Sequence, residues 1–580
     1  MPMRAARCSC ATTIPLRAWM ACAGGIVATR ALTIPPAQEI RATHGMVVAQ
    51  ESRAARIGIE ILDRGGNAVD AAVATAFALA VTYPRAGNIG GGGFMVIHLA
   101  KDNRDVAIDY RETAPAAITP TTFLDAQGNP DPAKSRDSAL SIGVPGTVAG
   151  LALAHKKYGS GRLSLADLIQ PAIDLAEKGF PVEDDLADSL PNAAKRLARF
   201  RSSADIFLNV DQPLHEGDRL LQFDLADTLT EIARKGPDAF YQGRIAERIA
   251  AAVQKAGGVM TKEDLAAYRA VERAVVRGSY SGYDIVSMPP PSSGGVHLIE
   301  MLNILEGYDL GKLPREQALH DEIEAMKRAY ADRAQYMGDP DAVSMPVAGL
   351  ISKQYAAKLR ASIGERATPS ADIRPGQAAD FEGRNTTHFS VIDRDGNAVS
   401  NTYTLNFSYG VGLVADGTGV LLNNELDDFT AKPGASNAYG LIGFNANLPV
   451  PGKRPLSSMT PTIVLKDGKP VLVTGSPGGS RIISAVLQVI VNALDFHMGI
   501  GDAVSAPRLH AQWQPDQVYV EADFPPALLN ALAARGHKIV PTEPHTAANS
   551  IAVLPKGEFT PQTYVGAADT RTRGALAAGY

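Results

Sequence analysis

The spacing of hydrophobic and polar residues predicts two consecutive helices shortly after residue 50. Apolar residues recur at helical intervals in SRAARIGIEILDR (52–64), and a Gly-Gly pair ends that pattern. Asn67 is a favourable N-cap for a second helix, AVDAAVATAFALAV (68–81), which ends before Pro84. This second helix is so rich in alanine that it must pack closely against another element.

A glycine-rich loop, GNIGGGGF (87–94), leads from these helices into an apolar strand. Neither GxGxxG nor GxxxxGK(S/T) fits this segment, so a phosphate-binding loop is excluded. We expect instead a close approach of bare backbone inside the fold, because glycine has no side chain to obstruct it.

The period of the pattern changes along the chain from helical to alternating. Residues 150–380 are mainly helical and end in a polar connector at 374–383. Beyond it lie the strand-like segments THFSVID, AVSNTYTLN, PTIVLKD and PVLVTGS, followed by the helical segment RIISAVLQVIVNALDF. Helical material followed by paired strands predicts an α+β fold in which helices pack on antiparallel sheet.

Composition excludes several classes of function. The 580 residues are 45% hydrophobic and 20% charged with a net charge of −5, so the chain lacks the basic surface of a nucleic-acid-binding protein. All three cysteines lie within the first 22 residues, which excludes a disulfide framework, a zinc ribbon and a cysteine nucleophile from the rest. The 11 histidines show no HExxH or other metal-ligand spacing, and Ser476 lacks the GxSxG elbow of α/β-hydrolases.

Residues 1–36 differ from the rest of the chain and predict a secretory signal peptide. Arginines precede a short apolar run of small residues at 18–28, and no acidic residue occurs before Glu39. The run is shorter than the roughly 20 apolar residues that span a bilayer, and no later stretch is suitable. We therefore expect a periplasmic or secreted protein without a membrane span. A disordered extension or an early start codon are alternative explanations, and Cys22 fits a lipoprotein cysteine poorly.

The polar connector meets the first strand at the sequence NTTH (385–388). An Asp-Gly turn signal separates this strand from the next. If those two turn residues form the whole loop, Thr386 lies opposite Leu405, with Thr404 and Asn406 on either side. A slip of one residue would bring Asn406 directly opposite instead. Taken alone, NTTH also fits an ordinary strand start.

A threonine becomes a strong nucleophile when it is the first residue of a chain, because its own α-amine then accepts the hydroxyl proton. That amine has an unperturbed pKa of about 7.7–8.0, which suits catalysis near neutral pH. The chain must first be cut before Thr386. The threonine hydroxyl can do this by attacking the preceding carbonyl, which gives an ester that water hydrolyses.

Four further segments carry groups that suit such a reaction. TGSPGGSR (474–481) places two glycines at a strand-to-helix junction, where bare N–H groups stabilise an oxyanion. DYRETAP (109–115) offers an arginine, which binds carboxylates bidentately. NNELDDF (423–429) offers acids for an ammonium group, and KRPLSSM (453–459) places two serines before a strand. Separately, each also fits a surface ion pair, a cap, a turn or a solvated loop.

Together these segments resemble the γ-glutamyltransferase (glutathione hydrolase) family of N-terminal nucleophile hydrolases. The resemblance extends from about residue 40 to Tyr580. It is carried, in chain order, by GGNAVDAAVA, GNIGGGGF, DYRETAP, NTTH, TYTLN, NNELDDF, KRPLSSM and TGSPGGSR. It implies a four-layer αββα sandwich and a precursor that cleaves itself into a large subunit (37–385) and a small subunit (386–580) sharing one fold. No cofactor or metal is expected.

The resemblance also implies the roles of individual residues at the point of reaction. Thr386 corresponds to the nucleophile and new N-terminus, and Asn385 to the last residue before the cut. Thr404 corresponds to the residue that hydrogen-bonds the nucleophile and supports processing. Gly478 and Gly479 correspond to the oxyanion hole.

The implied substrates are γ-glutamyl amides such as glutathione. The acyl group passes to water, which gives glutamate, or to an amino acid or peptide acceptor. Arg111, Ser457 and Ser458 correspond to the pocket for the α-carboxylate of the substrate.

Asn406, Glu425 and Asp428 correspond to the pocket for the α-amino group of the substrate. Glu425 falls where relatives vary between Glu and Gln. The segment KPGASNAYGLIGF (432–444) resembles the lid loop of the family, with Tyr439 as the gating aromatic residue. Its presence favours glutathione-type substrates, because some acylase-like relatives lack the loop.

Two other functions remain as alternatives. The first is a related acylase of the same fold that acts on a different amide, for which we would expect a degraded carboxylate pocket or a missing lid. The second is an unprocessed binding protein, for which we would expect the loss of Thr386 or Thr404. The sequence shows neither departure.

Overall fold

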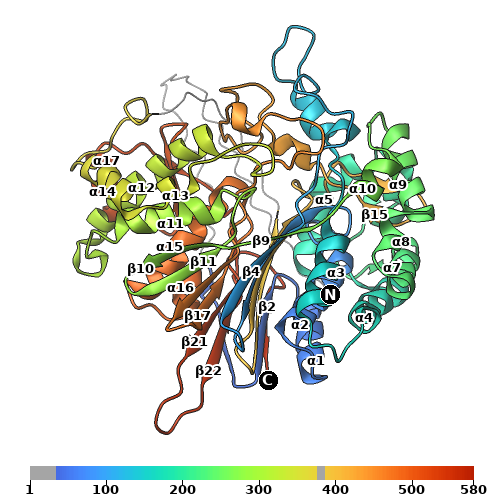
Figure 1. The fold of residues 1–580 in the computed structure, drawn as a ribbon, viewed down its shortest axis with the longest axis horizontal. Helices are drawn as coiled ribbons and strands as arrows, with labels where there is room; N and C mark the ends of the chain where they lie inside the picture. The colour runs from blue at the N-terminus through green and yellow to red at the C-terminus, as the bar shows by residue number, and fades with distance from the viewer. Residues whose placement is uncertain (1–33, 375–385) are drawn as a thin grey trace, which may run out of the picture.

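The computed structural model describes residues 34–374 and 386–580. Two seven-stranded sheets lie face to face, and helices cover the outer face of each (Figure 1). The first sheet, in spatial order, comprises β1 (Glu39–Ala42), β22 (Thr563–Ala567), β21 (Ser550–Leu554), β17 (Lys469–Thr474), β16 (Thr462–Lys466), β11 (Tyr283–Ser287) and β10 (Val276–Tyr280). The second comprises β23 (Leu576–Gly579), β2 (Gly45–Ala49), β12 (Thr387–Asp393), β13 (Ala398–Thr404), β3 (Gly92–Leu99), β4 (Arg104–Asp109) and β9 (Val271–Arg273).

In both sheets, each of these strands runs antiparallel to its neighbours. On the outer side of the second sheet, α1 (Ser52–Asp63), α2 (Ala68–Thr82) and α3 (Thr147–Tyr158) contact the sheet, while α4 (Leu165–Lys178) packs on α2 and α7 (Phe223–Lys235) packs on α4. On the outer side of the first sheet, α11 (Gly294–Leu305) and α16 (Ile500–Ser505) contact the sheet, and α12 (Arg315–Tyr336), α14 (Lys353–Ala361) and α15 (Ile482–Leu494) pack on α11. This arrangement confirms the expected αββα layers.

One hydrophobic core fills the space between the two sheets and continues under the helices of the first sheet. Met46 and Phe94 contribute to it from the second sheet, and Ile463 and Val473 contribute from the first. A separate core lies between the second sheet and its own helices. Alternating strand residues therefore serve two different cores, since successive side chains of a strand point to opposite faces.

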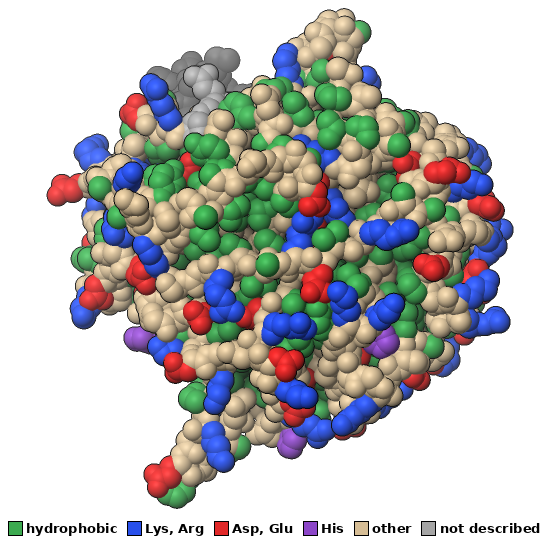
Figure 2. All heavy atoms as spheres, viewed as in Figure 1, with side chains coloured by type: hydrophobic (Ala, Val, Ile, Leu, Met, Phe, Trp, Pro, Cys, Tyr) green, Lys and Arg blue, Asp and Glu red, His purple; other side chains and the backbone are tan. Residues whose placement is uncertain are grey.

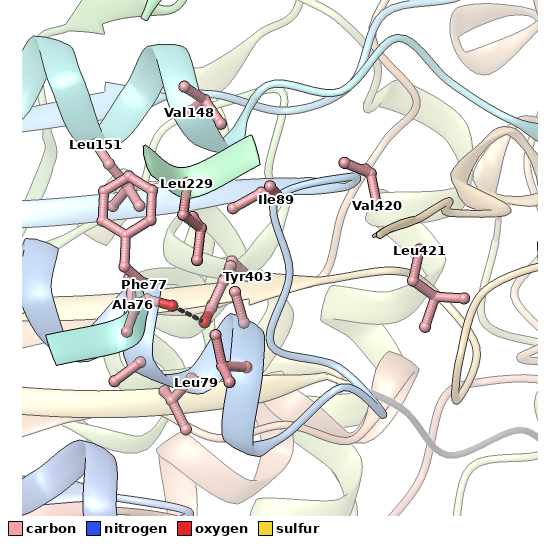
Figure 3. Packing of buried hydrophobic residues seen from close by; sticks show 14 of the residues in the cluster. Ala76, Phe77, Leu79, Ile89, Val148, Leu151, Leu229, Tyr403, Val420 and Leu421 are labelled. Carbon is pink, nitrogen blue, oxygen red and sulfur yellow. Dashed lines mark hydrogen bonds between the residues drawn. The ribbon is translucent and has the colours of Figure 1, made fainter. Parts of the chain in front are cut away.

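The alanine-rich helix α2 is entirely buried, as its composition predicts. Asn67 caps it by accepting hydrogen bonds from two backbone N–H groups, within a full capping box. Figure 3 shows side chains of this helix, including Phe77 and Leu79, packed against hydrophobic side chains of neighbouring elements. The Tyr403 hydroxyl donates to the Ala76 carbonyl at 2.9 Å and so ties β13 to this helix.

The glycine-rich loop brings backbone against backbone, as predicted. A Cβ atom on Gly90 would lie 2.1 Å from the Leu421 carbonyl oxygen, and one on Gly91 would lie 2.1 Å from the Thr404 carbonyl oxygen. Both positions are sterically closed to any side chain. The loop thereby holds the end of β13, where Thr404 lies.

The β12–β13 hairpin differs by one residue from the predicted register. Thr387 pairs with Tyr403, and the Asp393 N–H bonds the Asn397 carbonyl at 3.0 Å. The loop therefore has three residues, with Gly396 at φ 88° as its left-handed member, rather than two. The prediction that Leu405 faces Thr386 was wrong, because this register places Thr404 opposite Thr386. The pairing is shifted by one residue in the direction opposite to the shift that would have placed Asn406 there.

Two other predictions fall largely outside the described residues: most of the leader at 1–36, and most of the connector at 374–383 together with Asn385. Figure 2 shows basic and acidic side chains interspersed over one face of the molecule, in agreement with the small net charge. Of the helices in the described part of the chain, none has the length and apolar character needed to cross a membrane.

Candidate active site

Thr386 immediately precedes β12 and is 7% exposed. The antiparallel register that pairs Thr387 with Tyr403, continued by one residue, sets Thr386 opposite Thr404, the last residue of β13. Thr386 also lines a cavity of about 560 Å³. A hydroxyl at a strand end, beside a second hydroxyl-bearing residue and an open cavity, is accessible to a small-molecule substrate.

The backbone beyond β13 turns sharply and is held by side chains. The Thr404 Oγ1 accepts from the Asn406 N–H at 2.9 Å, and the Asn88 side chain donates to the Thr404 carbonyl at 2.8 Å. Asn406 has φ 71°, a left-handed conformation in which asparagine is one of the better-tolerated residues. Its side-chain oxygen accepts a hydrogen bond from the Tyr439 hydroxyl. Contacts thus run from Thr404 through Asn406 to the lid residue Tyr439.

The predicted glycine pair lies between β17 and α15. Gly478 has φ 132° and Gly479 φ 56°, and Gly479 begins a short 3-10 turn, Gly479–Arg481. A Cβ on Gly479 would lie 2.4 Å from Cδ1 of Tyr439, and a Cβ on Gly478 would lie 2.6 Å from Cγ2 of Thr546. Neither position has room for a side chain, so both glycines contribute only backbone atoms there.

Arg111 is fully buried and binds two carboxylates. Its Nη1 donates to Glu425, its Nη2 lies 2.5 Å from Asp428 Oδ2, and its Nε donates to the Pro455 carbonyl at 3.1 Å. Glu425 and Asp428 lie on one 3-10 turn, Glu425–Asp428. The sequence had assigned these residues to two different pockets, whereas the structure joins them in one ion cluster.

Glu112 adds a third acid to this cluster. Its Oε2 lies 3.9 Å from Arg111 Nη1, and neither carboxyl oxygen has a hydrogen-bond partner among the residues that the structure describes. Burial raises the pKa of Glu112 to about 7, despite the opposing charge of Arg111. Burial likewise raises the pKa of Glu425 and of Asp428. The cluster therefore holds a proton near neutral pH more tightly than free carboxylates would.

Ser457 and Ser458 lie next to the backbone that Arg111 contacts. The Ser457 Oγ accepts from the Met459 N–H at 3.0 Å, and the Ser458 Oγ accepts from Arg333 Nη2 at 3.0 Å. Within the described chain, neither hydroxyl donates a hydrogen bond. A serine hydroxyl that only accepts keeps its own hydrogen available for an incoming acceptor such as a carboxylate.

The lid segment contacts the ion cluster directly. Asn437 donates to Asp428 Oδ1 at 3.1 Å, and the Ala438 N–H donates to Asp427 Oδ2 at 3.2 Å. Tyr439 is only 7% exposed and covers Gly479. The segment thus closes the space over the acids and the glycine pair.

The open cavity beside Thr386 is lined by charged groups of both signs. Arg85 Nη1 lies 2.6 Å from Asp185 Oδ1, and Arg196 donates to the Ser408 and Gly410 carbonyls. The remaining lining includes Gln50, Phe407, His545 and Thr546.

Sequence reasoning named most of the residues that the structure gathers here. It missed Glu112, Asn88, Gln50 and Arg333. Glu112 directly follows Arg111 in DYRETAP and so was signalled by its neighbour. Arg333 lies near the end of the charge-rich, largely buried helix α12, and no local pattern distinguishes it from the other charged residues there.

Comparison with known proteins agrees with this geometry. Residues 54–579 match the family described as gamma-glutamyltranspeptidase. The chain is 52% identical over 545 residues to the glutathione hydrolase proenzyme of Escherichia coli (strain K12), covering 93% of each. Among solved structures it resembles cephalosporin acylase from Bacillus halodurans, with TM-score 0.83 and 30% identity over 96% of this chain and 99% of that chain. It also resembles Helicobacter pylori gamma-glutamyltranspeptidase, with TM-score 0.55 and 50% identity over 56% of this chain and 93% of that chain.

The layered fold and the threonine at the start of an inner strand define an N-terminal nucleophile hydrolase. Within that class, the chain belongs to the γ-glutamyltranspeptidase family.

Proposed function

We propose that this protein is a self-cleaving γ-glutamyltransferase and glutathione hydrolase with Thr386 as its nucleophile. The observation that carries the proposal is the position of Thr386, which faces Thr404 across the hairpin and lines an open cavity. The family match and the glutathione hydrolase proenzymes among the relatives support the same activity.

The first reaction is cleavage of the precursor. The Thr386 hydroxyl attacks the carbonyl carbon of Asn385, and the peptide C–N bond breaks as the hydroxyl proton passes to the departing nitrogen. Water then hydrolyses the ester and leaves Thr386 with a free α-amine. That amine is the base that later accepts the proton of the Thr386 hydroxyl.

In turnover, Thr386 Oγ attacks the γ-carbonyl of the substrate and forms an ester with the glutamyl group. The proton taken up by the α-amine goes to the leaving amine, which is Cys-Gly when the substrate is glutathione. Water then releases glutamate, or the amine of an amino acid or peptide takes the glutamyl group. The N–H groups of Gly478 and Gly479 stabilise the oxyanion of each tetrahedral intermediate.

The buried ion cluster and the two serines suit the free α-carbon end of a glutamyl group. Ser457 and Ser458 have hydroxyl hydrogens to donate to its α-carboxylate, and Arg111 adds positive charge. Asp428 and Glu425, with Asn406, offer oxygens to its ammonium group. Tyr439 covers this end of the site. A substrate without a free glutamate head would leave these buried polar groups unpaired, which disfavours it.

The cavity beside Thr386 is on the other side of the reacting carbonyl and suits the leaving group and the acceptor. Its lining includes Arg85, Arg196, Asp185 and His545, so it accommodates a polar, zwitterionic peptide or amino acid. The two ends of the substrate would thus be recognised by different sets of residues.

A related acylase acting on another amide is the second candidate, because the solved structure of a cephalosporin acylase covers 96% of this chain. The presence of the lid at 432–444 and of Ser457, Ser458 and Arg111 favours γ-glutamyl substrates over it.

We further propose three parts for the precursor: a signal peptide at 1–36, a large subunit at 37–385 and a small catalytic subunit at 386–580. The leader directs the protein to the periplasm or the exterior of the cell. Both subunits contribute strands to both sheets, so they remain associated after cleavage.

The test combines denaturing mass spectrometry of the purified protein with an assay of γ-glutamyl-p-nitroanilide and glutathione. Two chains are expected, the smaller beginning at Thr386, together with release of the amine from both substrates. A single stable chain with full activity would refute the mechanism. Two chains that hydrolyse only a non-glutamyl amide would favour the acylase.

A further inference from the structure

Arg333 is a buried arginine on α12 whose charge is not balanced by a carboxylate. It is 4% exposed, and its guanidinium donates to two serine hydroxyls: Nη2 to Ser458 Oγ at 3.0 Å and Nε to Ser293 Oγ at 2.9 Å. Among residues 34–374 and 386–580, it forms no ion pair with an acid.

Other buried arginines of this protein differ in that respect. Arg328, on the same helix, binds Glu324 Oε2 at 2.6 Å, and Arg508 binds Asp569 Oδ2 at 2.7 Å. Arg111 binds two acids. An unpaired charge in a protein interior is costly, so buried charges are normally paired. Arg333, which contacts the proposed carboxylate pocket, has no such carboxylate partner in the described part of the chain.

The hydrogen bonds of Arg333 help to fix the positions of Ser457 and Ser458, the two serines of that pocket. Because Ser458 Oγ accepts from the guanidinium, its own hydrogen is directed elsewhere. Ser293 Oγ accepts from the guanidinium and donates to the Ser457 carbonyl at 2.7 Å, while the Ser293 N–H donates to the same carbonyl at 2.8 Å. Arg333 therefore holds Ser458 directly and Ser457 through Ser293.

Arg111 alone does not give the pocket a net positive charge, because it is bound to Glu425 and Asp428. Arg333 forms no ion pair with either of those acids in the described residues, although Asp428 is close enough to attract its charge. Its positive charge is thus available to an anion bound at the two serine hydroxyls.

We propose that Arg333 is a positioning residue for the α-carboxylate of the substrate and acts through Ser458 and Ser293. It supplies positive charge to the pocket, because the charge of Arg111 is already balanced by Glu425 and Asp428. The inference rests on the proposed γ-glutamyl activity and extends it. It makes Arg333 a determinant of specificity for acyl groups that carry a carboxylate on the α-carbon.

The test compares two substrates that differ only in that carboxylate: γ-glutamyl-p-nitroanilide and 4-aminobutyryl-p-nitroanilide. In Arg333→Met, kcat/KM for the γ-glutamyl substrate is expected to fall by about 10- to 100-fold, mostly through KM, as for loss of a hydrogen bond to a charged group. For the 4-aminobutyryl substrate the same variant should change kcat/KM little. Arg333→Lys, which keeps the charge, should restore part of the discrimination.

Arg328→Met is the matched control, because it removes a buried arginine from the same helix without touching the serines. It should lower thermal stability and leave the ratio of the two kcat/KM values as in the wild type. Mass spectrometry establishes that each variant has cleaved itself.

Equal losses on both substrates in Arg333→Met would overturn the role of Arg333 and leave the γ-glutamyl activity intact. Should that variant fail to fold, Ser293→Ala provides the second test, since it removes only the hydroxyl that joins Arg333 to Ser457. An unchanged substrate ratio in Ser293→Ala would equally overturn the role. A wild-type enzyme that does not hydrolyse the γ-glutamyl substrate would refute the proposed function itself.

Discussion

The ring of Tyr439 lies directly against the backbone of Gly479, so close that a Cβ atom on the glycine would lie 2.4 Å from Cδ1 of the ring. The Tyr439 hydroxyl reaches the Asn406 side chain on the other side of the site. Tyr439 can occupy this position only because Gly479 has no side chain. If Tyr439 gates the site and Gly479 belongs to the oxyanion hole, as we propose, closing of the lid and formation of the hole are structurally coupled.

Gly479→Ala should reduce turnover strongly, because the methyl group displaces Tyr439 and alanine disfavours φ 56°. Loss of one oxyanion donor typically lowers kcat by roughly 100- to 1,000-fold. Steady-state kinetics with γ-glutamyl-p-nitroanilide measure the effect. Gly452→Ala is the control, because Gly452 also has positive φ, 73°, but has no atom within 4 Å of the added methyl group. Near-normal turnover in Gly479→Ala would contradict the assignment.

Thr386→Ala should give a single uncut chain without hydrolase activity, since the residue supplies both the attacking hydroxyl and the later α-amine. Denaturing mass spectrometry and the amide assay measure the two losses. Thr387→Val provides the control at the adjacent position. The Thr387 hydroxyl is buried and has no hydrogen-bond partner in the described part of the chain, so valine, which has nearly the same shape, should permit cleavage and activity. Cleavage of Thr386→Ala at the normal position would exclude the self-cleavage mechanism.

Arg111→Gln should lower kcat/KM for γ-glutamyl substrates while permitting self-cleavage. Removing this cation leaves two buried acids uncompensated, and truncating one partner of such a pair costs roughly 2–5 kcal/mol. The expected fall in kcat/KM is therefore roughly 30-fold or more. Arg201→Gln removes an exposed arginine paired with Asp205 and should have no measurable effect. Failure of Arg111→Gln to cleave itself would show that Arg111 supports the precursor structure.

Glu112 should make stability depend on pH. Its pKa is raised to about 7 by burial, from an ordinary value of 4.5, so the folded protein holds this proton more tightly than the unfolded chain does. The stabilisation is complete below about pH 4, declines as the pH rises, and is lost above about pH 7. Glu112→Gln removes this contribution, which at 1.36 kcal/mol per pKa unit amounts to about 3 kcal/mol.

The difference is best measured by calorimetry in the uncut Thr386→Ala chain. Between pH 5 and pH 8, the melting temperature of the protein with Glu112 should fall relative to that of the Glu112→Gln variant. Parallel melting curves for the two proteins over that range would show that Glu112 is ionised in the folded state.

Local sequence predicted the elements that carry the site. The alanine-rich helix and its Asn67 cap depend on side chains within a few residues of each other, and the structure has both as expected. The strands β12 and β13 follow from alternating apolar positions. The close approach at Gly90 and Gly91 was also predictable, because a run of glycines has few other uses in a buried segment.

The hairpin register was not predictable from the Asp-Gly signal alone. Two-residue and three-residue loops both place glycine in a left-handed conformation, and they differ by one residue in the pairing that results. The structure has the three-residue loop, and consequently Thr404 instead of Leu405 is opposite Thr386. Such a choice depends on how both strands fit between β2 and β3, which lie elsewhere in the chain.

The sequence by itself determined the helical and strand periods, the caps, the glycine-lined turns and the residue types at the candidate site. These properties arise from neighbouring residues and need no knowledge of distant contacts. Only the tertiary structure decided that Arg111 is committed to Glu425 and Asp428, that burial raises the pKa of Glu112, and that Arg333 reaches Ser458 from another layer. Charge balance and pKa depend on burial and on partners distant in sequence, and these are set only when the layers pack together.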